Sequence, residues 1–365
     1  MDKKREKAFQ ASHRATGSAA KLVGVTLNKK IVAVMFLAGA VGALPAVAGP
    51  SGYQLAKTVQ LGGDGGWDLM AFDAARHHLF ITHSTHVVVV DTASGTIAGD
   101  IPDTPQAHGV ALASDLGKGF VTAGGSNSVA VFDLATLKPT ASIAVGTKPD
   151  AILYDPDSRR VFVFNAGSNN ATVIDAAAGT IAGTIALGGK PEMAAGFDGH
   201  VFLNLEDKSE LLDIDAKSLS IAHRYPLAPC TEPSGIAADS AHKLLFIGCH
   251  DKMMAVVDAA SGKVIATPPI GQGVDSNRFD PETGFAFSSN GDGTLTVVHE
   301  DGAGKFSVIE NVATQAGART MEIDPGTHDV FLVTADRVPT ASTAQDPHPR
   351  PSIVPGTFRL LVYSR

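Results

Sequence analysis

One pattern repeats seven times along this 365-residue chain, and it constrains the fold more than any other feature. Each copy has an apolar segment, an Asp at a short polar turn, and a second apolar segment that carries a Phe. Successive copies are 40, 42, 40, 44, 41 and 44 residues apart, measured between Phe80, Phe120, Phe162, Phe202, Phe246, Phe287 and Phe331. A period of this size indicates an array of similar structural units.

The content of each copy predicts strands. A third apolar segment, such as residues 87–91, mostly ends in Asp, and a turn such as Ala93-Ser94-Gly95 leads to a fourth, such as residues 96–101. A helical repeat would space its apolar residues by three and four, whereas these are short β-branched runs broken by turns. We therefore predict an all-β chain, a seven-bladed β-propeller of four-stranded blades.

The two ends of the repeat array complement each other. The seventh copy has a third strand at residues 358–363, and the chain then stops without a fourth. Residues 53–61 precede the first copy and read as an unpaired fourth strand. We expect this N-terminal strand to complete the last blade and close the ring, which removes free sheet edges. The alternative is a flexible linker.

Two of the turns support a family resemblance. The segments Val88-Val89-Val90-Asp91-Thr92-Ala93-Ser94-Gly95-Thr96-Ile97 and Ala255-Val256-Val257-Asp258-Ala259-Ala260-Ser261-Gly262-Lys263-Val264 resemble the YVTN-type repeats of the YncE-like family of exported bacterial propellers. The resemblance covers residues 53–365 and implies the fold. The resemblance does not indicate a particular reaction or ligand, because similar propellers include lactonases, the heavy chain of methylamine dehydrogenase and the non-catalytic propellers of copper or haem reductases.

The N-terminus reads as an export signal. Eight Lys or Arg lie within residues 1–30, an apolar stretch follows at residues 31–44, and Ala46-Val47-Ala48 comes after Pro45. This layout predicts a secretory signal over residues 1–48, cleaved after Ala48, and a single propeller domain over residues 49–365. The protein is then expected to be periplasmic or secreted, monomeric and without a membrane span after cleavage. The alternative is an uncleaved anchor, although 14 apolar residues are few for a span of about 20.

Charge and motifs narrow the function classes. Residues 31–365 carry 21 Lys or Arg against 35 Asp or Glu, a net charge of −14, which disfavours binding to nucleic acid. The sequence contains no His-Glu-x-x-His, Cys-x-x-Cys-His, Gly-x-Ser-x-Gly or Gly-x-x-x-x-Gly-Lys-Ser/Thr motif. No recognisable catalytic motif therefore decides whether the protein is an enzyme.

Repeat symmetry predicts a site at one mouth of the central channel. Equivalent positions of successive blades surround the ring axis, so polar residues that recur at one repeat position should meet. The position five residues before each repeat Asp holds Asp68, Val110, Asp150, Met193, Ser234, Asp275 and Arg319, with His108, Glu192 and Glu232 close to three of them. The ends of the second strands add His83 and Asn290, and the loops after them add His86, His250, Asp251 and Asp292.

This set of side chains is a candidate ligand-binding site. Converging carboxylates, amides and imidazoles can hold a divalent cation, with oxygens favouring calcium and nitrogens favouring zinc. No cofactor is certain. The alternative is a structural ion-pair cluster of Arg319, Asp275 and Asp68, with Asp150 and Glu192 simply hydrated.

Three functions remain open at this point. The first is a binding protein for a small molecule or a periplasmic partner protein. The second is a metal-dependent lactonase or hydrolase with Asp150, Glu192, His83 or His108 as the base. The third is a partner subunit of a periplasmic redox system that brings no cofactor of its own.

Two further features belong to the exported domain. Cys230 precedes the fifth copy and Cys249 ends its second strand, so both ends of that hairpin reach one face and we expect a disulfide. The alternative is an isolated buried thiol. A proline-rich insertion at residues 335–356 is expected to form a lid or a docking arm, or else an exposed disordered loop.

Overall fold

The computed structural model describes residues 49–302, 304–340 and 351–365. The predicted signal over residues 1–48 and the middle of the proline-rich insertion lie outside the described residues. Among the residues that are described, no helix is long and apolar enough to span a membrane. The only helices there are the 3-10 turns η1 (Ser114–Leu116) and η2 (Glu206–Lys208).

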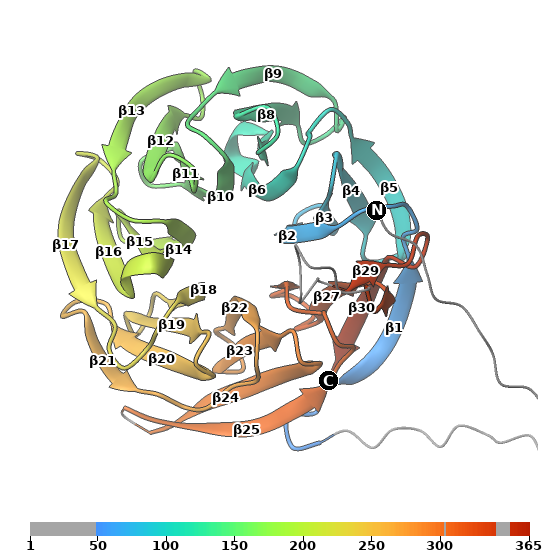
Figure 1. The fold of residues 1–365 in the computed structure, drawn as a ribbon, viewed down its shortest axis with the longest axis vertical. Helices are drawn as coiled ribbons and strands as arrows, with labels where there is room; N and C mark the ends of the chain where they lie inside the picture. Colours follow the sequence, from blue (N-terminus) through green and yellow to red (C-terminus); the bar gives the residue numbers. More distant parts are fainter. Residues whose placement is uncertain (1–48, 303, 341–350) are drawn as a thin grey trace, which may run out of the picture. The chain divides into compact units, whose positions relative to one another are not determined.

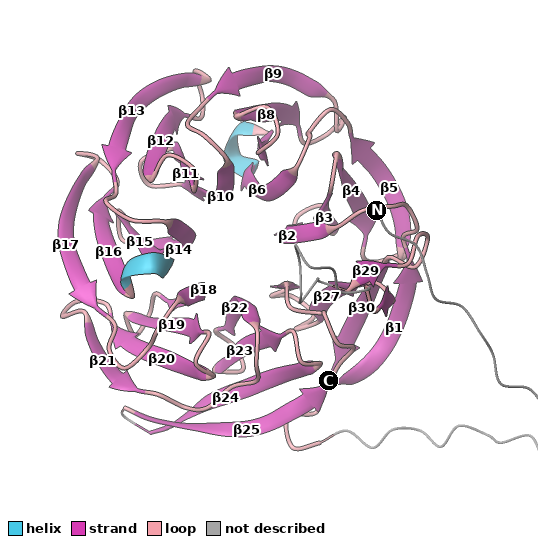
Figure 2. Ribbon diagram, in the orientation of Figure 1, coloured by secondary structure: helices cyan, strands magenta, loops and turns pink. Residues whose placement is uncertain are grey.

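Seven four-stranded antiparallel sheets form a ring, which confirms the predicted β-propeller (Figures 1 and 2). The first six blades use consecutive strands from the ring axis outward, and each blade begins with an inner strand beside the axis. These strands are β2 (Trp67–Asp73), β3 (His78–His83), β4 (His86–Asp91) and β5 (Thr96–Ile101); β6 (Ala107–Ala113), β7 (Lys118–Ala123), β8 (Ser128–Asp133) and β9 (Pro139–Ala144); β10 (Pro149–Asp155), β11 (Arg160–Asn165), β12 (Asn170–Asp175) and β13 (Thr180–Ala186); β14 (Pro191–Phe197), β15 (His200–Leu205), β16 (Glu210–Asp215) and β17 (Ser220–Pro226); β18 (Pro233–Asp239), β19 (Leu244–Cys249), β20 (Met253–Asp258) and β21 (Lys263–Ala266); and β22 (Val274–Asp280), β23 (Phe285–Asn290), β24 (Thr294–Gly302) and β25 (Lys305–Ala313).

The seventh blade is closed by the N-terminal strand, as expected from the unpaired ends of the repeat array. Its order is β26 (Met321–Ile323), β27 (Val330–Thr334), β30 (Arg359–Ser364) and β1 (Gln54–Gln60). β1 pairs antiparallel with β30 from Gln54 opposite Ser364 to Gln60 opposite Arg359. The sheet edge that the end of the chain would leave open is therefore covered.

The recurring Asp residues make the turns. In the first blade, Asp73 is buried and accepts a hydrogen bond from the backbone N–H of Ala75 at 3.1 Å. At the end of the third strand, Asp91 accepts one from the N–H of Ser94 at 2.8 Å. A short side chain that bonds the backbone two or three residues ahead stabilises a tight reversal, which explains why the repeat keeps Asp at these positions.

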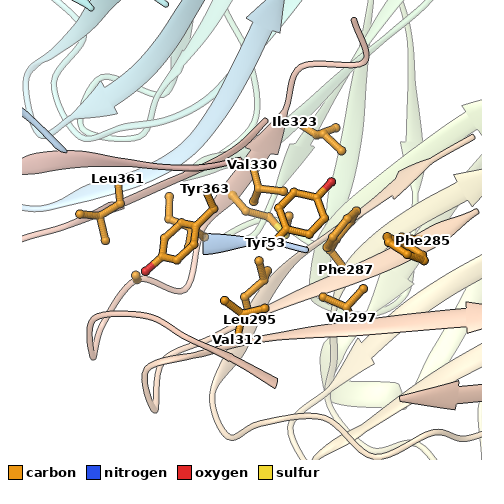
Figure 3. Close-up of a cluster of buried hydrophobic side chains, with 13 residues drawn as sticks. Tyr53, Phe285, Phe287, Leu295, Val297, Val312, Ile323, Val330, Leu361 and Tyr363 are labelled. Carbon is orange, nitrogen blue, oxygen red and sulfur yellow. The ribbon is translucent and has the colours of Figure 1, made fainter. Parts of the chain in front are cut away.

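The core lies between the blades. Seven apolar clusters each join residues of two neighbouring blades, and the Phe of every repeat copy is at most 3% exposed. Figure 3 shows the cluster between the sixth and seventh blades, where Tyr53 packs edge-on against Phe287 with ring centroids 5.3 Å apart. Full burial of one such side chain stabilises the fold by about 1.5–3 kcal/mol, so blade stacking supplies much of the stability.

Two features are added to the regular blades. Cys230 and Cys249 are joined in a disulfide, the pairing expected from the sequence, with α-carbons 5.6 Å apart. At the base of the proline-rich insertion, β28 (Arg337–Val338) pairs with β29 (Ser352–Ile353) as a short antiparallel ladder.

Candidate functional site

In the first six blades, the second residue of the inner strand carries the polar side chains of one channel mouth. These residues are Asp68 on β2, His108 on β6, Asp150 on β10, Glu192 on β14, Ser234 on β18 and Asp275 on β22. Figure 1 shows these strands around the ring axis. A cavity of about 330 Å³ at this end is lined by Asp68, Leu69, Asp150, Ala151, Lys190, Glu192, Met193, Glu206, Ser234, His250, Asp275 and Arg319.

This register corrects the repeat position used in the sequence analysis. Counting back from the repeat Asp selects Val110 and Met193, but in these two blades, as in the seventh, the Asp lies beyond the end of the inner strand. Asp115 belongs to η1 and Asp198 follows the end of β14, so the count is displaced by two residues and by one. The side chains that take the mouth position are therefore His108 and Glu192.

Asp68, His108 and Asp150 form the tightest group at the mouth. The Nδ1 atom of His108 lies 2.6 Å from an oxygen of Asp68 and 3.7 Å from an oxygen of Asp150. The hydrogen bond to Asp68 is the largest influence on His108 and raises its pKa, with the charge of Asp150 adding to it against the effect of burial. The imidazole therefore tends to be protonated while it lies between the two carboxylates.

A second group shares a single ammonium. Lys190 Nζ lies 2.8 Å from Glu192 and also bonds to Glu206. Burial raises the pKa of Glu192 to about 8, against the hydrogen bond from Lys190. Burial acts to raise the pKa of Glu206, but the hydrogen bonds from Lys190 and Glu192 together with the Lys190 charge outweigh it, and the pKa lies below the usual range. One positive charge therefore stabilises Glu206 as a carboxylate and leaves Glu192 favouring the protonated form.

The third group is Asp275 with Arg319. Arg319 Nε lies 3.2 Å from Asp275 Oδ2, but that oxygen is buried and accepts no hydrogen bond. Burial raises the pKa of Asp275 to about 6, with the Arg319 charge opposing it and the Asp68 charge adding to it. The predicted contact between Arg319 and Asp275 is thus present, but the arginine side chain is 45% exposed and neutralises the carboxylate incompletely.

The cavity carries an excess of negative charge. Five carboxyl groups line it against two permanently basic groups, Lys190 and Arg319, which leaves a formal charge of −3 when every carboxyl group is ionised and the histidines are neutral. Burial, together with the Asp68 charge, raises the pKa of Asp150 to about 6. Raised carboxyl pKa values show that the mouth would be stabilised by added positive charge.

Several residues proposed from the sequence do not line this cavity, among them His83, Asn290 and Glu232. His83 is 1% exposed and stacks on Phe358 with ring centroids 4.4 Å apart, and burial lowers its pKa. Asn290 is fully buried and bonds Ser288, Thr294 and Thr296. Both end second strands, which lie one strand outward from the axis. Glu232 precedes β18, so its side chain is 63% exposed and contacts His250 outside the cavity lining.

Two lining residues were missed. Lys190 lies just before β14, and Glu206 directly follows β15. The sequence could have indicated both residues. Lys190 directly precedes an inner strand and Glu206 directly follows a second strand, next to the positions from which the other candidates were taken. His250, which follows a second strand in the same way as Glu206, does line the cavity as the loop analysis suggested.

Asp68, His108 and Asp150 can hold a metal ion. One donor atom from each lies within 4.8 Å of the others, close enough for all three to reach one ion after small side-chain movements. The donor set, one imidazole nitrogen and two carboxylate oxygens, suits zinc and similar transition metals. Beside this group, a groove of about 700 Å³ lined by Trp67, Gln106, Lys148 and others shares Asp68, Asp150 and Lys190 with the mouth.

Comparison with known proteins supports the fold. No protein-family model and no curated protein matches the sequence. A structure titled Kuenenia stuttgartiensis Hydrazine Synthase is similar with a TM-score of 0.65 and 16% identity, over 73% of this chain and 92% of that one. A chain from the structure titled Crystal Structure of Mitotic Checkpoint Complex is similar with a TM-score of 0.68 and 14% identity, over 93% of this chain and 99% of the other. At these identities the likeness shows the propeller fold alone.

Proposed function

We propose that this propeller is a binding protein whose channel mouth takes a divalent cation on Asp68, His108 and Asp150, and recruits a small ligand there. The observation that carries the proposal is the convergence of three donor atoms within 4.8 Å, two of them from Asp68 and Asp150, which line the cavity with a formal charge of −3, and the third from His108 in the adjoining groove. A structural ion-pair cluster would balance its charges, and this cavity does not. A cation would supply the missing charge, and the adjoining groove would give a ligand access to it.

The donor set favours a transition metal over calcium. Calcium takes six to eight oxygen ligands, whereas His108 offers a nitrogen at the centre of the group. A metal at this position would replace the proton that His108 shares with Asp68. Zinc is therefore the preferred candidate among the cations considered from the sequence.

The test is calorimetric titration of metal-free protein with Zn²⁺ and with Ca²⁺. We expect wild type to bind Zn²⁺ more tightly than Ca²⁺ and Asp150→Asn to bind Zn²⁺ at least about tenfold more weakly, since it loses a charged ligand. Glu232→Gln is the matched control, because it removes a carboxylate of the same face that lies outside the cavity lining. Equal Zn²⁺ affinity in wild type and Asp150→Asn would refute the proposal.

A metal-dependent hydrolase is the second candidate. The observation that favours it is Glu192, whose pKa of about 8 makes it a proton donor or acceptor near neutral pH in the cavity that Asp68 and Asp150 also line. His83 is not available for this role, because it is buried beside Phe358. Ester and lactone hydrolysis measured with Zn²⁺ should then fall at least about a hundredfold in Glu192→Gln, and absence of any turnover by wild type would leave the binding function alone.

Export to an oxidising compartment is part of the proposal. The Cys230–Cys249 disulfide supports it, since such bonds persist in the periplasm and outside the cell. The resemblance of the turns to the YncE-like family agrees with the same location. Thiol titration of denatured, unreduced protein from the periplasm should find no free thiol, and two free thiols would contradict it. A role as a partner subunit in redox chemistry is supported by the fold resemblance alone, and no residue of the channel mouth favours it.

A further inference from the structure

The first described residues of the chain are held in place ahead of β1. Ser51 is fully buried, and Tyr53 is 1% exposed with its hydroxyl donating a hydrogen bond to the backbone oxygen of His328 at 2.9 Å. The N–H of Gly52 donates to the carbonyl oxygen of Gly49 at 3.0 Å, which closes a turn over these residues. Because the turn is anchored by buried side chains, Gly49 occupies a defined place on the propeller.

The side chain of Glu310 receives this segment. Glu310 lies on β25, the outermost strand of the sixth blade, which is next to β1 on the outer rim of the ring (Figure 1). Its Oε2 atom accepts hydrogen bonds from the backbone N–H of Ser51 at 2.9 Å and from Ser51 Oγ at 2.6 Å. Among the residues of the described ranges, none donates a hydrogen bond to Oε1 and none forms an ion pair with this carboxylate.

The second oxygen of Glu310 lies against the backbone of Gly49. A Cβ atom placed on Gly49 would stand 1.7 Å from Oε1. Standard bond lengths then put Oε1 within about 3.3 Å of the Gly49 α-carbon and within about 4.2 Å of its nitrogen. A carboxylate without a basic partner in the described part of the chain is therefore within ion-pair distance of that nitrogen.

We infer that Glu310 is a binding site for the α-ammonium group of Gly49, which forms when the export signal is cleaved between Ala48 and Gly49. Hydrolysis of this peptide bond consumes one water molecule. It leaves a carboxylate on Ala48 and turns the amide nitrogen of Gly49 into an amine, which takes the carboxyl proton and is positively charged at pH 7. The inference rests on the export part of the proposed function and does not depend on the metal site.

The ion pair fastens the ring at a second place. β1 closes the seventh blade through its ladder with β30, and the ammonium group of Gly49 joins the start of the same segment to β25 of the sixth blade. A charged donor makes a stronger hydrogen bond to a carboxylate than an amide N–H does. In the uncleaved chain the same nitrogen is an uncharged amide, so the ion pair belongs to the processed protein alone.

The first measurement is the intact mass of the protein recovered from the periplasm after export of the full-length chain. We expect an unmodified N-terminus at Gly49. Retention of residues 1–48 would overturn both this inference and the proposal of export. A cleaved chain that begins at another residue would overturn the inference and leave export in place.

Melting temperature then tests the ion pair itself. The chain that begins at Gly49 is compared with one that keeps Ala48, whose amine lies about 3.8 Å further along the chain, and each is made with Glu310 and with Glu310→Gln. Keeping Ala48 should lower the melting temperature by about 2–4 °C when Glu310 is present. It should change the melting temperature by less than about 1 °C in Glu310→Gln, because that variant lacks the charge.

A carboxylate of the same blade supplies the matched control. Glu300 on β24 accepts a hydrogen bond from the N–H of Gly304 at 3.1 Å, and Glu300→Gln should leave the full effect of keeping Ala48. Added salt should reduce that effect in the chain with Glu310, since it screens the ion pair. An equal effect of Ala48 with Glu310 and with Glu310→Gln, or no effect with Glu310, would overturn the inference while the cleaved N-terminus still supported export.

Discussion

The two ends of the central channel use the same kinds of charged residue in opposite ways. At the far end, Arg278 binds Glu322 through two parallel contacts, Nε to Oε1 at 2.7 Å and Nη2 to Oε2 at 2.9 Å. This pair lines a cavity of about 480 Å³ whose other residues are mostly apolar. Leu69 and Met193 line both this cavity and the mouth, so they stand between the two ends.

The difference lies in charge balance. The guanidinium of Arg278 fits the carboxylate of Glu322 in the bidentate geometry that Arg favours. At the mouth, Arg319 approaches Asp275 with one nitrogen and without a hydrogen bond to the nearer oxygen, and carboxylates outnumber the basic groups. The comparison shows that a largely buried carboxylate can be neutralised by a paired arginine, as at the far end, or only in part, as at the mouth, and the proposed ligand site depends on the second case.

The largest predicted effect is at the far end. Arg278→Met leaves Glu322, whose side chain is only 13% exposed, without its partner, and we expect it to lower the free energy of unfolding by about 3–5 kcal/mol in urea denaturation. Replacing both partners, as Arg278→Met with Glu322→Leu, should recover most of the loss. A single variant within about 1 kcal/mol of wild type would break the comparison, because the pair would then not be structural.

An intermediate effect is expected from pH at the mouth. Burial raises the folded pKa of Asp150 from 3.8 to about 6, so the folded state binds a proton more tightly than the unfolded one. Its contribution to stability is therefore present below pH 4 and is lost as the pH rises through about 6. We expect Asp150→Asn to remove on the order of 2 kcal/mol of this pH dependence between pH 4 and 7, measured as melting temperature against pH. Parallel curves for variant and wild type would contradict the pKa shift.

The smallest effect is expected for Arg319→Met. The arginine side chain is 45% exposed and lacks the paired geometry of Arg278, so its loss should change the free energy of unfolding by about 0–1 kcal/mol. The same substitution should raise the pKa of Asp275 further, since Arg319 is the charge that lowers it. Carboxyl titration by NMR would detect this. A destabilisation as large as that of Arg278→Met would favour the structural ion-pair alternative for the mouth.

Part of the site was predictable because the propeller repeats. Asp68, Asp150 and Asp275 occupy one repeat position in the sequence and meet in the structure, since equivalent positions of inner strands surround one axis. His108 and Glu192 were named as neighbours of that position, but their exact register was not predictable. It depends on where β6 and β14 end relative to Asp115 and Asp198, which backbone pairing decides.

The sequence by itself determined the seven-bladed fold and the closure of its ring, because both follow from a local pattern repeated at a constant period and from two unpaired strands at its ends. The tertiary structure alone decided which polar side chains share a cavity. His83 and Asn290 end second strands and are buried, while Lys190 reaches the channel mouth from a loop and Glu206 from the 3-10 turn η2. The contact of Ser51 with Glu310 joins residues that are 259 positions apart in the sequence. Local pattern governs strand formation, but charge balance and ligand geometry depend on distances between strands that only the folded ring fixes.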